Sequence, residues 1–497
     1  MTTALNGYRY RTTGWIRRAG YGTASAIIAI AAFLALRGGE PPPEFPVPER
    51  TLQGGAVLAA SGSGASVAKT LTYAVTKFGA KGDGVANDRA AIQKAVDQAG
   101  ANGGGVVYFP KGVYLVDDSI VVSKDNVILK GVGPESEIRI TKHPKRVVVI
   151  SGSSHNAVRY LQVSLGVGDV QRHDNDEGIY VTNKAKDFLI EKVLGNGKGI
   201  MARGEVDGGV IRDNIIKKTL ADGIHLTGGS KNIVVENNLV SETGDDSIAV
   251  VSYKAQQMLC SNITIRGNRI YRSHSRGIAH VGGEKVLILN NRVINTTSSG
   301  ILIDRDGNYD TYAPDDTRVE GNTVKFAGAY ALLTGERGNS FGIEVSAGAL
   351  SVVLVGNAVS SGAGRGISVS APGTLIQNNV ITGNGSIGLQ VDGSDCSIIG
   401  NVIENNGTYG FFSEGSDRLI VVGNQWLNNN TSGGQYIDNF LLKDSRHSII
   451  TDNESMETRE RMQVERAYEL VGSCQGTTFD RNKMKGTLLG TDISCSA

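Results

Sequence analysis

Three aspartates with a regular spacing are the strongest chemical signal in this sequence. Asp222 precedes the adjacent pair Asp245 and Asp246 by little more than twenty residues. If that interval is one turn of a repeating fold, the three carboxylates lie close together and repel one another. Such repulsion raises the pKa of at least one carboxyl group, which leaves a protonated acid beside an ionised base. Hydrolysis of a glycosidic bond requires such an acid and base.

Other polar residues stand in the same sequence context, just before a short apolar strand. In order along the chain this place holds Glu177, then, after one weaker repeat, Asp222, Asp246, Arg276 and Ser299. A purely structural explanation is that aspartates at such turns accept hydrogen bonds from backbone N–H groups. The remaining candidates for contact with a substrate lie on or beside the neighbouring strands: Lys198, His225, His280, Asp304, Arg305 and Tyr309.

A sequence repeat beginning near residue 146 must position these residues. Each unit contains a Gly-Ile-x-Val type of strand, as in residues 223–226, and an Asn-Asn or Gly-Asn pair, as in residues 237–238. Short strands that recur at a nearly constant interval are typical of a solenoid. We therefore predict an all-β fold, a right-handed parallel β-helix in which each coil adds one strand to each of three sheets. Asparagine at a coil corner is expected to stack in a ladder, because it tolerates left-handed backbone angles.

Composition excludes several classes of protein. Of 497 residues, 66 are glycine and 40% are hydrophobic, and no Gly-X-Y period occurs, so the chain is neither collagen-like nor wholly disordered. Lys and Arg total 50 against 49 Asp and Glu. This balance argues against a protein that holds nucleic acid through a surplus of positive charge.

The first 70 residues differ from the rest. Four arginines precede an apolar run over residues 24–36, so residues 1–40 are interpreted as a signal peptide or membrane anchor. Residues 41–70, rich first in proline and then in glycine and serine, read as a linker. The protein is therefore expected to be secreted, periplasmic or on the cell surface, with a membrane tether through the N-terminus if the segment is retained.

The folded body is predicted to be one β-helix domain over residues 71–452, followed by a C-terminal cap over 453–497. A helix from Asp88 to Ala99 is expected to close the first coil, whose bare strand edges would otherwise be sticky. Cys474 and Cys495 either form a disulfide in the tail or remain reduced. The other two cysteines, Cys260 and Cys396, are expected to lie in the core.

Residues 72–140 resemble the opening coil of the pectate-lyase-like superfamily. The resemblance rests on Phe-Gly-Ala-Lys-Gly-Asp-Gly at 78–84, the helix at 88–99, and Gly-Gly-Val-Val-Tyr-Phe-Pro at 104–110. It implies the right-handed β-helix. Hydrolases, lyases, epimerases and phage tailspikes share this opening, so it does not choose among chemistries.

The aspartate motifs resemble those of the polygalacturonase family of inverting glycoside hydrolases. Asp222-Gly223 matches its first motif, and Gly-Asp-Asp-Ser-Ile at 244–248 matches its second. The resemblance implies that Asp245 is the general acid and that Asp222 and Asp246 position water. Ser-Arg-Gly at 275–277 replaces the family's Gly-His-Gly, and its Arg-x-Lys motif is absent, which puts galacturonan in doubt as the substrate.

Two other functions remain open. A polysaccharide lyase or uronate C5-epimerase of this fold needs a base, a proton donor and a group that neutralises the carboxylate, which is an arginine, a lysine or Ca²⁺. His225 or His280, Tyr180, Arg276 and Lys198 are the candidates, and the acidic run at 173–177 with Asp245 is the candidate calcium site. The Asp-Pro-His triplet of alginate epimerases is not found, and hydrolysis itself requires no cofactor.

The third function is non-catalytic binding of glycan, in which Tyr309 would stack on a sugar ring. In every case the expected partner is a polysaccharide, with no nucleic acid, and the chain is expected to be a monomer or a trimer.

Overall fold

The computed structural model describes residues 71–168, 170–330, 340–434, 438–461, 463–487 and 489–496. The expected signal or anchor segment and the linker lie outside these ranges. Within them, no helix has both the length and the apolar character needed to cross a membrane.

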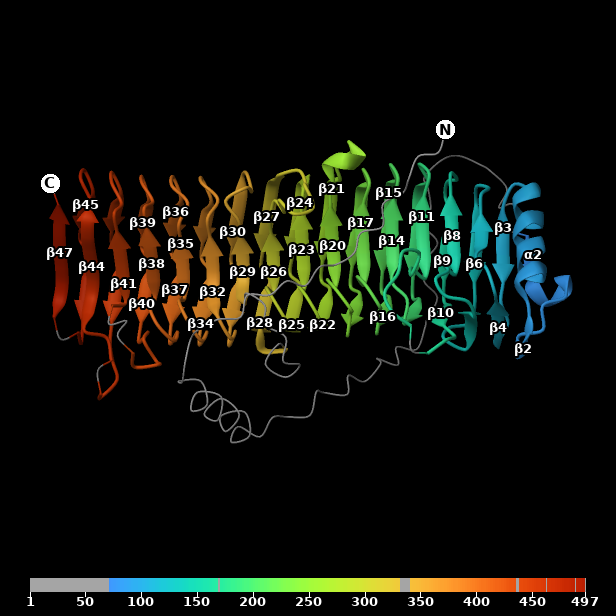
Figure 1. The fold of residues 1–497 in the computed structure, drawn as a ribbon, viewed down its shortest axis with the longest axis horizontal. Coiled ribbons are helices and arrows are strands. Elements are labelled where there is room, and N and C mark those ends of the chain that lie inside the picture. Colours follow the sequence, from blue (N-terminus) through green and yellow to red (C-terminus); the bar gives the residue numbers. More distant parts are fainter. Residues whose placement is uncertain are drawn as a thin grey trace, which may run out of the picture. The chain divides into compact units, whose positions relative to one another are not determined.

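The strands form three long parallel sheets, which we call A, B and C, and each coil contributes one strand to each sheet (Figure 1). Sheet A contains β1 (Thr72–Ala74), β3 (Gly105–Tyr108), β6 (Val127–Lys130), β9 (Ala157–Arg159), β12 (Lys186–Glu191), β15 (Asp207–Arg212), β18 (Lys231–Glu236), β21 (Ser261–Arg266), β24 (Gly283–Leu289), β27 (Pro314–Glu320), β30 (Val352–Val355), β33 (Leu375–Gln377), β36 (Ser397–Ile399), β39 (Ile420–Val422), β42 (Ile449–Thr451) and β45 (Thr478–Asp480). Sheet B contains β2 (Asp83–Asn87), β4 (Gly112–Val116), β7 (Ser136–Ile140), β10 (Gln162–Leu165), β13 (Leu194–Asn196), β16 (Ile215–Lys217), β19 (Leu239–Ser241), β22 (Arg269–Ser273), β25 (Arg292–Thr296), β28 (Thr323–Ala327), β31 (Ala358–Ser360), β34 (Val380–Thr382), β37 (Val402–Glu404), β40 (Gln425–Leu427), β43 (Glu454–Met456) and β46 (Lys483–Lys485). Sheet C contains β5 (Ile120–Val122), β8 (Val148–Ser151), β11 (Ile179–Thr182), β14 (Ile200–Arg203), β17 (Ile224–Thr227), β20 (Ile248–Val251), β23 (Ile278–Val281), β26 (Ile301–Ile303), β29 (Phe341–Val345), β32 (Arg365–Val369), β35 (Leu389–Val391), β38 (Phe411–Glu414), β41 (Phe440–Lys443), β44 (Arg466–Ser473) and β47 (Gly490–Ser496). The predicted right-handed parallel β-helix is therefore confirmed.

Strict register between coils builds the core. In sheet C, Ile224 pairs with Ile248, and Ile248 pairs with Ile278 on the next coil. All three side chains are fully buried. Because strand side chains alternate in direction, the residue after each isoleucine faces outward, so His225 and Ala249 form part of an outer column.

Stacked asparagines line the turn between sheets A and B, as the sequence predicted. The Asn322 side chain donates to Asn357 Oδ1 at 3.0 Å and to the Ile288 carbonyl at 2.8 Å. Its own Oδ1 accepts from the backbone N–H and side chain of Asn291, at 2.8 and 3.0 Å. The same pattern links Asn214, Asn238, Asn268, Asn291, Asn322, Asn357, Asn379, Asn401, Asn424, Asn453 and Asn482.

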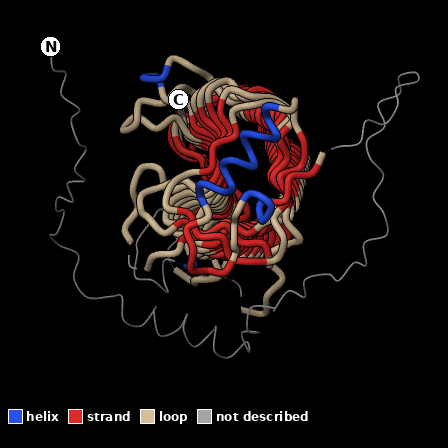
Figure 2. Tube along the Cα trace, turned by 90° about the vertical axis from the view of Figure 1, so that its right-hand side faces the viewer, coloured by secondary structure: helices blue, strands red, loops and turns tan. Residues whose placement is uncertain are grey.

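The helix α2 (Arg89–Ala101) lies across the end of the first coil (Figure 2). Its buried face consists of Ile92, Ala95, Val96 and Ala99. The two short 3-10 helices are η1 (Val75–Phe78), which precedes β2, and η2 (Lys254–Gln256), which follows β20.

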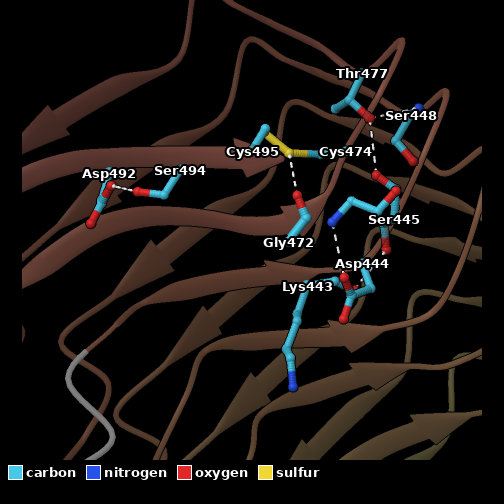
Figure 3. The surroundings of a disulfide bond; sticks show 11 residues. Lys443, Asp444, Ser445, Ser448, Gly472, Cys474, Thr477, Asp492, Ser494 and Cys495 are labelled. Carbon is cyan, nitrogen blue, oxygen red and sulfur yellow. Dashed lines mark hydrogen bonds between the residues drawn. A yellow bond between two sulfur atoms is a disulfide. The ribbon is translucent and has the colours of Figure 1, made fainter. Parts of the chain in front are cut away.

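Residues 453–497 continue the coils, because β43 to β47 extend all three sheets. The boundary expected at residue 453 therefore does not separate a different structure. Cys474 and Cys495 form a disulfide with their Cα atoms 5.4 Å apart (Figure 3). Cys260 and Cys396 are free and buried, as expected.

We predict that the ladder contributes measurably to stability. Asn322→Ala removes four hydrogen bonds and leaves buried neighbours unpaired, which should lower the free energy of unfolding by about 3 kcal/mol. Denaturant unfolding followed by circular dichroism measures this loss. Asn308→Ala, at an exposed loop position, is the control and should change little; equal losses for both variants would contradict the role of the ladder.

Candidate active site

The three aspartates come together at the turn that leads into sheet C. Asp222 precedes β17, and Asp245 and Asp246 precede β20 on the next coil. One carboxylate oxygen from each lies within 4.8 Å of the others. Asp222 Oδ1 accepts the backbone N–H of Asp246 at 3.1 Å, and Asp246 Oδ1 accepts that of Arg276 at 2.9 Å. A backbone N–H of each coil thus holds the carboxylate of the preceding coil in place through a hydrogen bond.

Each aspartate has its own cationic partner. Asp222 Oδ2 lies 2.7 Å from His225 Nδ1, and Asp246 Oδ2 accepts from Arg276 Nη2 at 2.9 Å. Asp245 forms an ion pair with Arg172. The side chain of Asp245 is 29% exposed, against 11% for Asp222 and 5% for Asp246. Asp245 is therefore the member of the cluster most open to a polymer.

These surroundings shift the pKa values of Asp222 and Asp246 in opposite directions. Burial raises the pKa of Asp246 to about 7 in spite of Arg276, and the charges of Asp222 and Asp245 act in the same sense. Burial also disfavours the charge on Asp222, but His225 outweighs it and holds the pKa of Asp222 below its usual 3.8. Near neutral pH the cluster therefore contains both a protonated and an ionised carboxyl group.

A cavity adjoins the cluster on the outer face of sheet C. Its wall includes Arg172 and His173 from the segment between β10 and β11, and Tyr253 and Gln256 beyond β20. Its floor includes His225, whose Nε2 has no hydrogen-bond partner among the described residues. Burial, followed by the charge of Asp222, raises the pKa of Tyr253 to about 12.

The charge of Asp222 also acts on His225 itself. Burial alone would lower the pKa of this imidazole, but Asp222 and the hydrogen bond to it raise the pKa above its usual 6.5. His225 is therefore a cation held by Asp222 at mildly acidic pH, and its Nε2 is buried without a hydrogen-bond partner among the described residues.

Two expected substrate contacts are buried instead. His280 is on the inward face of β23, fully buried, with Nδ1 3.1 Å from Thr317 Oγ1, and burial lowers its pKa to about 3. Lys198 is also fully buried, and its Nζ donates to the Lys145 carbonyl at 3.1 Å. Neither side chain can meet a polymer on the surface, so we remove both from the site.

The other predicted contacts are spread around the sheet. Glu177 lines the cavity, but Arg146 Nε binds its carboxylate at 2.7 Å. Asp304 and Arg305 follow β26, so they lie at the C-terminal ends of the strands of sheet C, whereas the aspartates lie at the N-terminal ends. Tyr309 is farther along the same segment and is 58% exposed. Arg276 reaches the cluster, where it binds Asp246.

The acidic run proposed for calcium is already engaged. Asp176 lies 3.1 Å from His143 Nδ1, and Glu177 is paired with Arg146. The aspartate cluster has the oxygen donors that Ca²⁺ prefers, but His225, Arg172 and Arg276 already balance its charge. The donor set therefore does not fit a calcium ion well, and we derive no chemical step through a metal.

Arg172 could not be predicted from the sequence, because the repeat does not show that the long turn before β11 extends across three coils to Asp245. Tyr253 could have been found, since it follows directly on the strand that carries the aspartate pair. Both residues complete the cavity.

Comparison with known proteins places the chain among β-helices. A family model described as rhamnogalacturonase A/epimerase, pectate lyase-like, matches residues 73–302. A model described as a right-handed β-helix region matches residues 253–374 and 341–493. Mannuronan C5-epimerase AlgE1 of Azotobacter vinelandii is 27% identical over 260 residues, which is 50% of this chain and 17% of the epimerase.

Two solved structures share the fold. The A-module of the A. vinelandii mannuronan C-5 epimerase AlgE6 has a TM-score of 0.54 and 19% identity, covering 78% of this chain and 100% of the module. The catalytic unit of a GH87 α-1,3-glucanase from Streptomyces thermodiastaticus has a TM-score of 0.51 and 17% identity, covering 85% of this chain and 71% of the glucanase.

We predict that ionisation of Asp246 lowers the free energy of unfolding, because the pKa of Asp246 is raised in the folded chain. The carboxyl group is protonated in both states well below its usual pKa of 3.8. As pH rises above that value the unfolded chain ionises while the folded chain keeps its proton, so stability is lost as pH rises towards 7. Asp246→Asn removes this dependence. Between pH 4 and pH 8 the melting temperature of the variant should rise relative to that of the unsubstituted chain by on the order of 5 °C. The difference in pKa between the two states is worth roughly 4 kcal/mol, and 1 kcal/mol is worth about 1 °C for a chain of this length.

Differential scanning calorimetry at several pH values measures this gain. Asp213→Asn, an exposed aspartate at the turn between sheets A and B, is the matched control and should show a constant difference. A constant difference for Asp246→Asn as well would contradict the raised pKa.

Proposed function

Because the chain is a pectate lyase-like right-handed β-helix, we propose that it acts on an extracellular polysaccharide and hydrolyses its glycosidic bonds. The observation that carries this proposal is the aspartate cluster, in which three carboxylates from two coils lie within 4.8 Å with their pKa values moved apart. Most glycosidases use a pair of carboxyl groups in different protonation states.

In the proposed reaction, Asp245 protonates the glycosidic oxygen as the bond from that oxygen to the anomeric carbon breaks. A water molecule attacks the same carbon and gives its proton to Asp222, whose low pKa keeps it ionised. Asp246 holds the cluster's proton in the free protein, and its closeness to Asp245 allows the proton to move between them. Asp245 is assigned the acid role because it is the most exposed of the three.

The spacing bears on stereochemistry. Carboxyl groups in inverting enzymes stand roughly 6.5–9.5 Å apart, with room for water, and in retaining enzymes about 5–5.5 Å apart. The separation here is shorter than the first range. The direct attack of water proposed above inverts the configuration of the anomeric carbon, as the polygalacturonase resemblance implies, but the distance between the carboxylates does not itself support inversion.

A second candidate function uses His225. His225 and Tyr253 both line the cavity, and His225 Nε2 is buried without a hydrogen-bond partner among the described residues. An imidazole and a phenol at one cavity suit removal and return of a proton at C5 of a uronate, which is the chemistry of a lyase or an epimerase. The sequence match to mannuronan C5-epimerases favours this alternative.

We predict that Asp245→Asn lowers hydrolysis by about a thousandfold, the usual contribution of a general acid. The assay incubates the chain with pectin, alginate and α-1,3-glucan and measures new reducing ends together with ultraviolet absorbance from unsaturated sugars. Asp213→Asn is the control and should retain full activity.

The products distinguish the alternatives. New reducing ends without ultraviolet absorbance indicate hydrolysis, and absorbance indicates a lyase. Epimerisation changes neither signal and is detected by proton NMR of the polymer. Full hydrolysis by Asp245→Asn would rule out the assigned acid.

A further inference from the structure

A second hollow lies on the far side of Asp245 from the cavity. It is lined by Lys218, Thr219, Glu242, Gly244, His274 and Tyr330. Lys218, Glu242 and His274 follow strands of sheet B in three successive coils, and Tyr330 follows β28 two coils further on. The hollow therefore lies on the turns that lead from sheet B to sheet C. Thr219 lines both hollows, and Gly244 immediately precedes Asp245. The two hollows therefore adjoin each other at the aspartate cluster.

The hollow has a defined wall. The rings of His274 and Tyr330 meet edge to face with centroids 5.1 Å apart, and the Tyr330 hydroxyl lies 3.4 Å from His274 Nε2. Gly244 packs tightly on the preceding coil, because an added Cβ would come within 2.4 Å of the Leu220 carbonyl oxygen. An aromatic ring beside the charged groups of Lys218 and Glu242 is a suitable surface for a sugar, which has apolar faces and hydroxyl edges.

The path along sheet C is closed on the other side of the cluster. Ala249, Ala279 and Leu302 continue the outer column of His225, yet they are 1%, 0% and 8% exposed. Tyr253 packs against them.

Several contacts join the segment after β26 to the segment after β20. Lys254 Nζ binds Asp310 at 2.6 Å, and the Tyr312 N–H donates to the Ser252 carbonyl at 2.9 Å. A polymer in the cavity therefore has no open route along the coils over β20, β23 and β26.

We propose that the glycan crosses the edge of the coils at Asp245, with one sugar in the cavity beside His225 and the next sugar in the hollow beside Tyr330. This inference rests on the proposed hydrolysis and adds the direction of the substrate. The scissile bond then lies over Asp245, and Tyr330 and His274 are the residues that bind the sugar on the outer side. The enzyme accordingly needs a sugar on both sides of the bond.

The test measures binding in the Asp245→Asn background, so that no probe is cleaved. The probes are hexasaccharides of galacturonate, of alginate and of α-1,3-linked glucose, and isothermal titration calorimetry gives Kd. Tyr330→Ala should weaken binding of the preferred hexasaccharide about tenfold, as expected for loss of a stacking ring. His274→Ala is the second variant, and the melting temperature of each variant checks folding.

Gln390→Ala is the control, since Gln390 is farther along the outer face of sheet C. Unchanged affinity for this variant, with weaker binding by Tyr330→Ala and His274→Ala, supports the crossing path. Weaker binding by Gln390→Ala alone, or no effect of any variant, overturns that path while hydrolysis by the unsubstituted chain keeps the proposed function. No binding of any hexasaccharide, together with no products, overturns both.

Discussion

The axial stacking of coils, about 4.8 Å apart and in register, is the constraint on which the rest of this structure depends. A residue type that recurs at one place in the repeat is forced against its own kind. For isoleucine this makes a continuous core, and for asparagine it makes a ladder whose amides satisfy one another. For a charged residue the same stacking is costly, so the order of charges along the coils carries information.

The charged column before sheet C illustrates this cost. In chain order, its members are Arg146, Glu177, Lys198, Asp222, Asp246 and Arg276. Every neighbouring pair is opposite in charge except Asp222 and Asp246. A column built only for stability would place a cation there as well, because like charges stacked at this distance repel. The like-charged pair Asp222 and Asp246 lies beside the cavity and Asp245. This pattern is expected where function outweighs stability.

The repeat made the fold and the aspartate cluster predictable, because both depend only on sequence interval and coil stacking. The same logic could have excluded His280. It lies two residues after an inward isoleucine, and the alternation of a strand returns it to the core. The burial of Lys198 could not be predicted in this way, since it depends on how Asp176 and Glu177 are placed around the side chain. Arg172 depends on the path of an irregular turn, which no periodicity describes.

Arg276 occupies the place where the polygalacturonase motif has histidine, and this changes how protons can move. A guanidinium stays charged at any physiological pH, so Arg276 can hold Asp246 but cannot accept or donate a proton in turnover. In the polygalacturonase pattern a titrating imidazole stands at that position. Here the imidazole of His225 lies on the other side of the cluster from Arg276 and is bound to Asp222. A proton at the cluster can therefore be held by the carboxylates or by His225 but not by Arg276, which is the main departure from the polygalacturonase pattern.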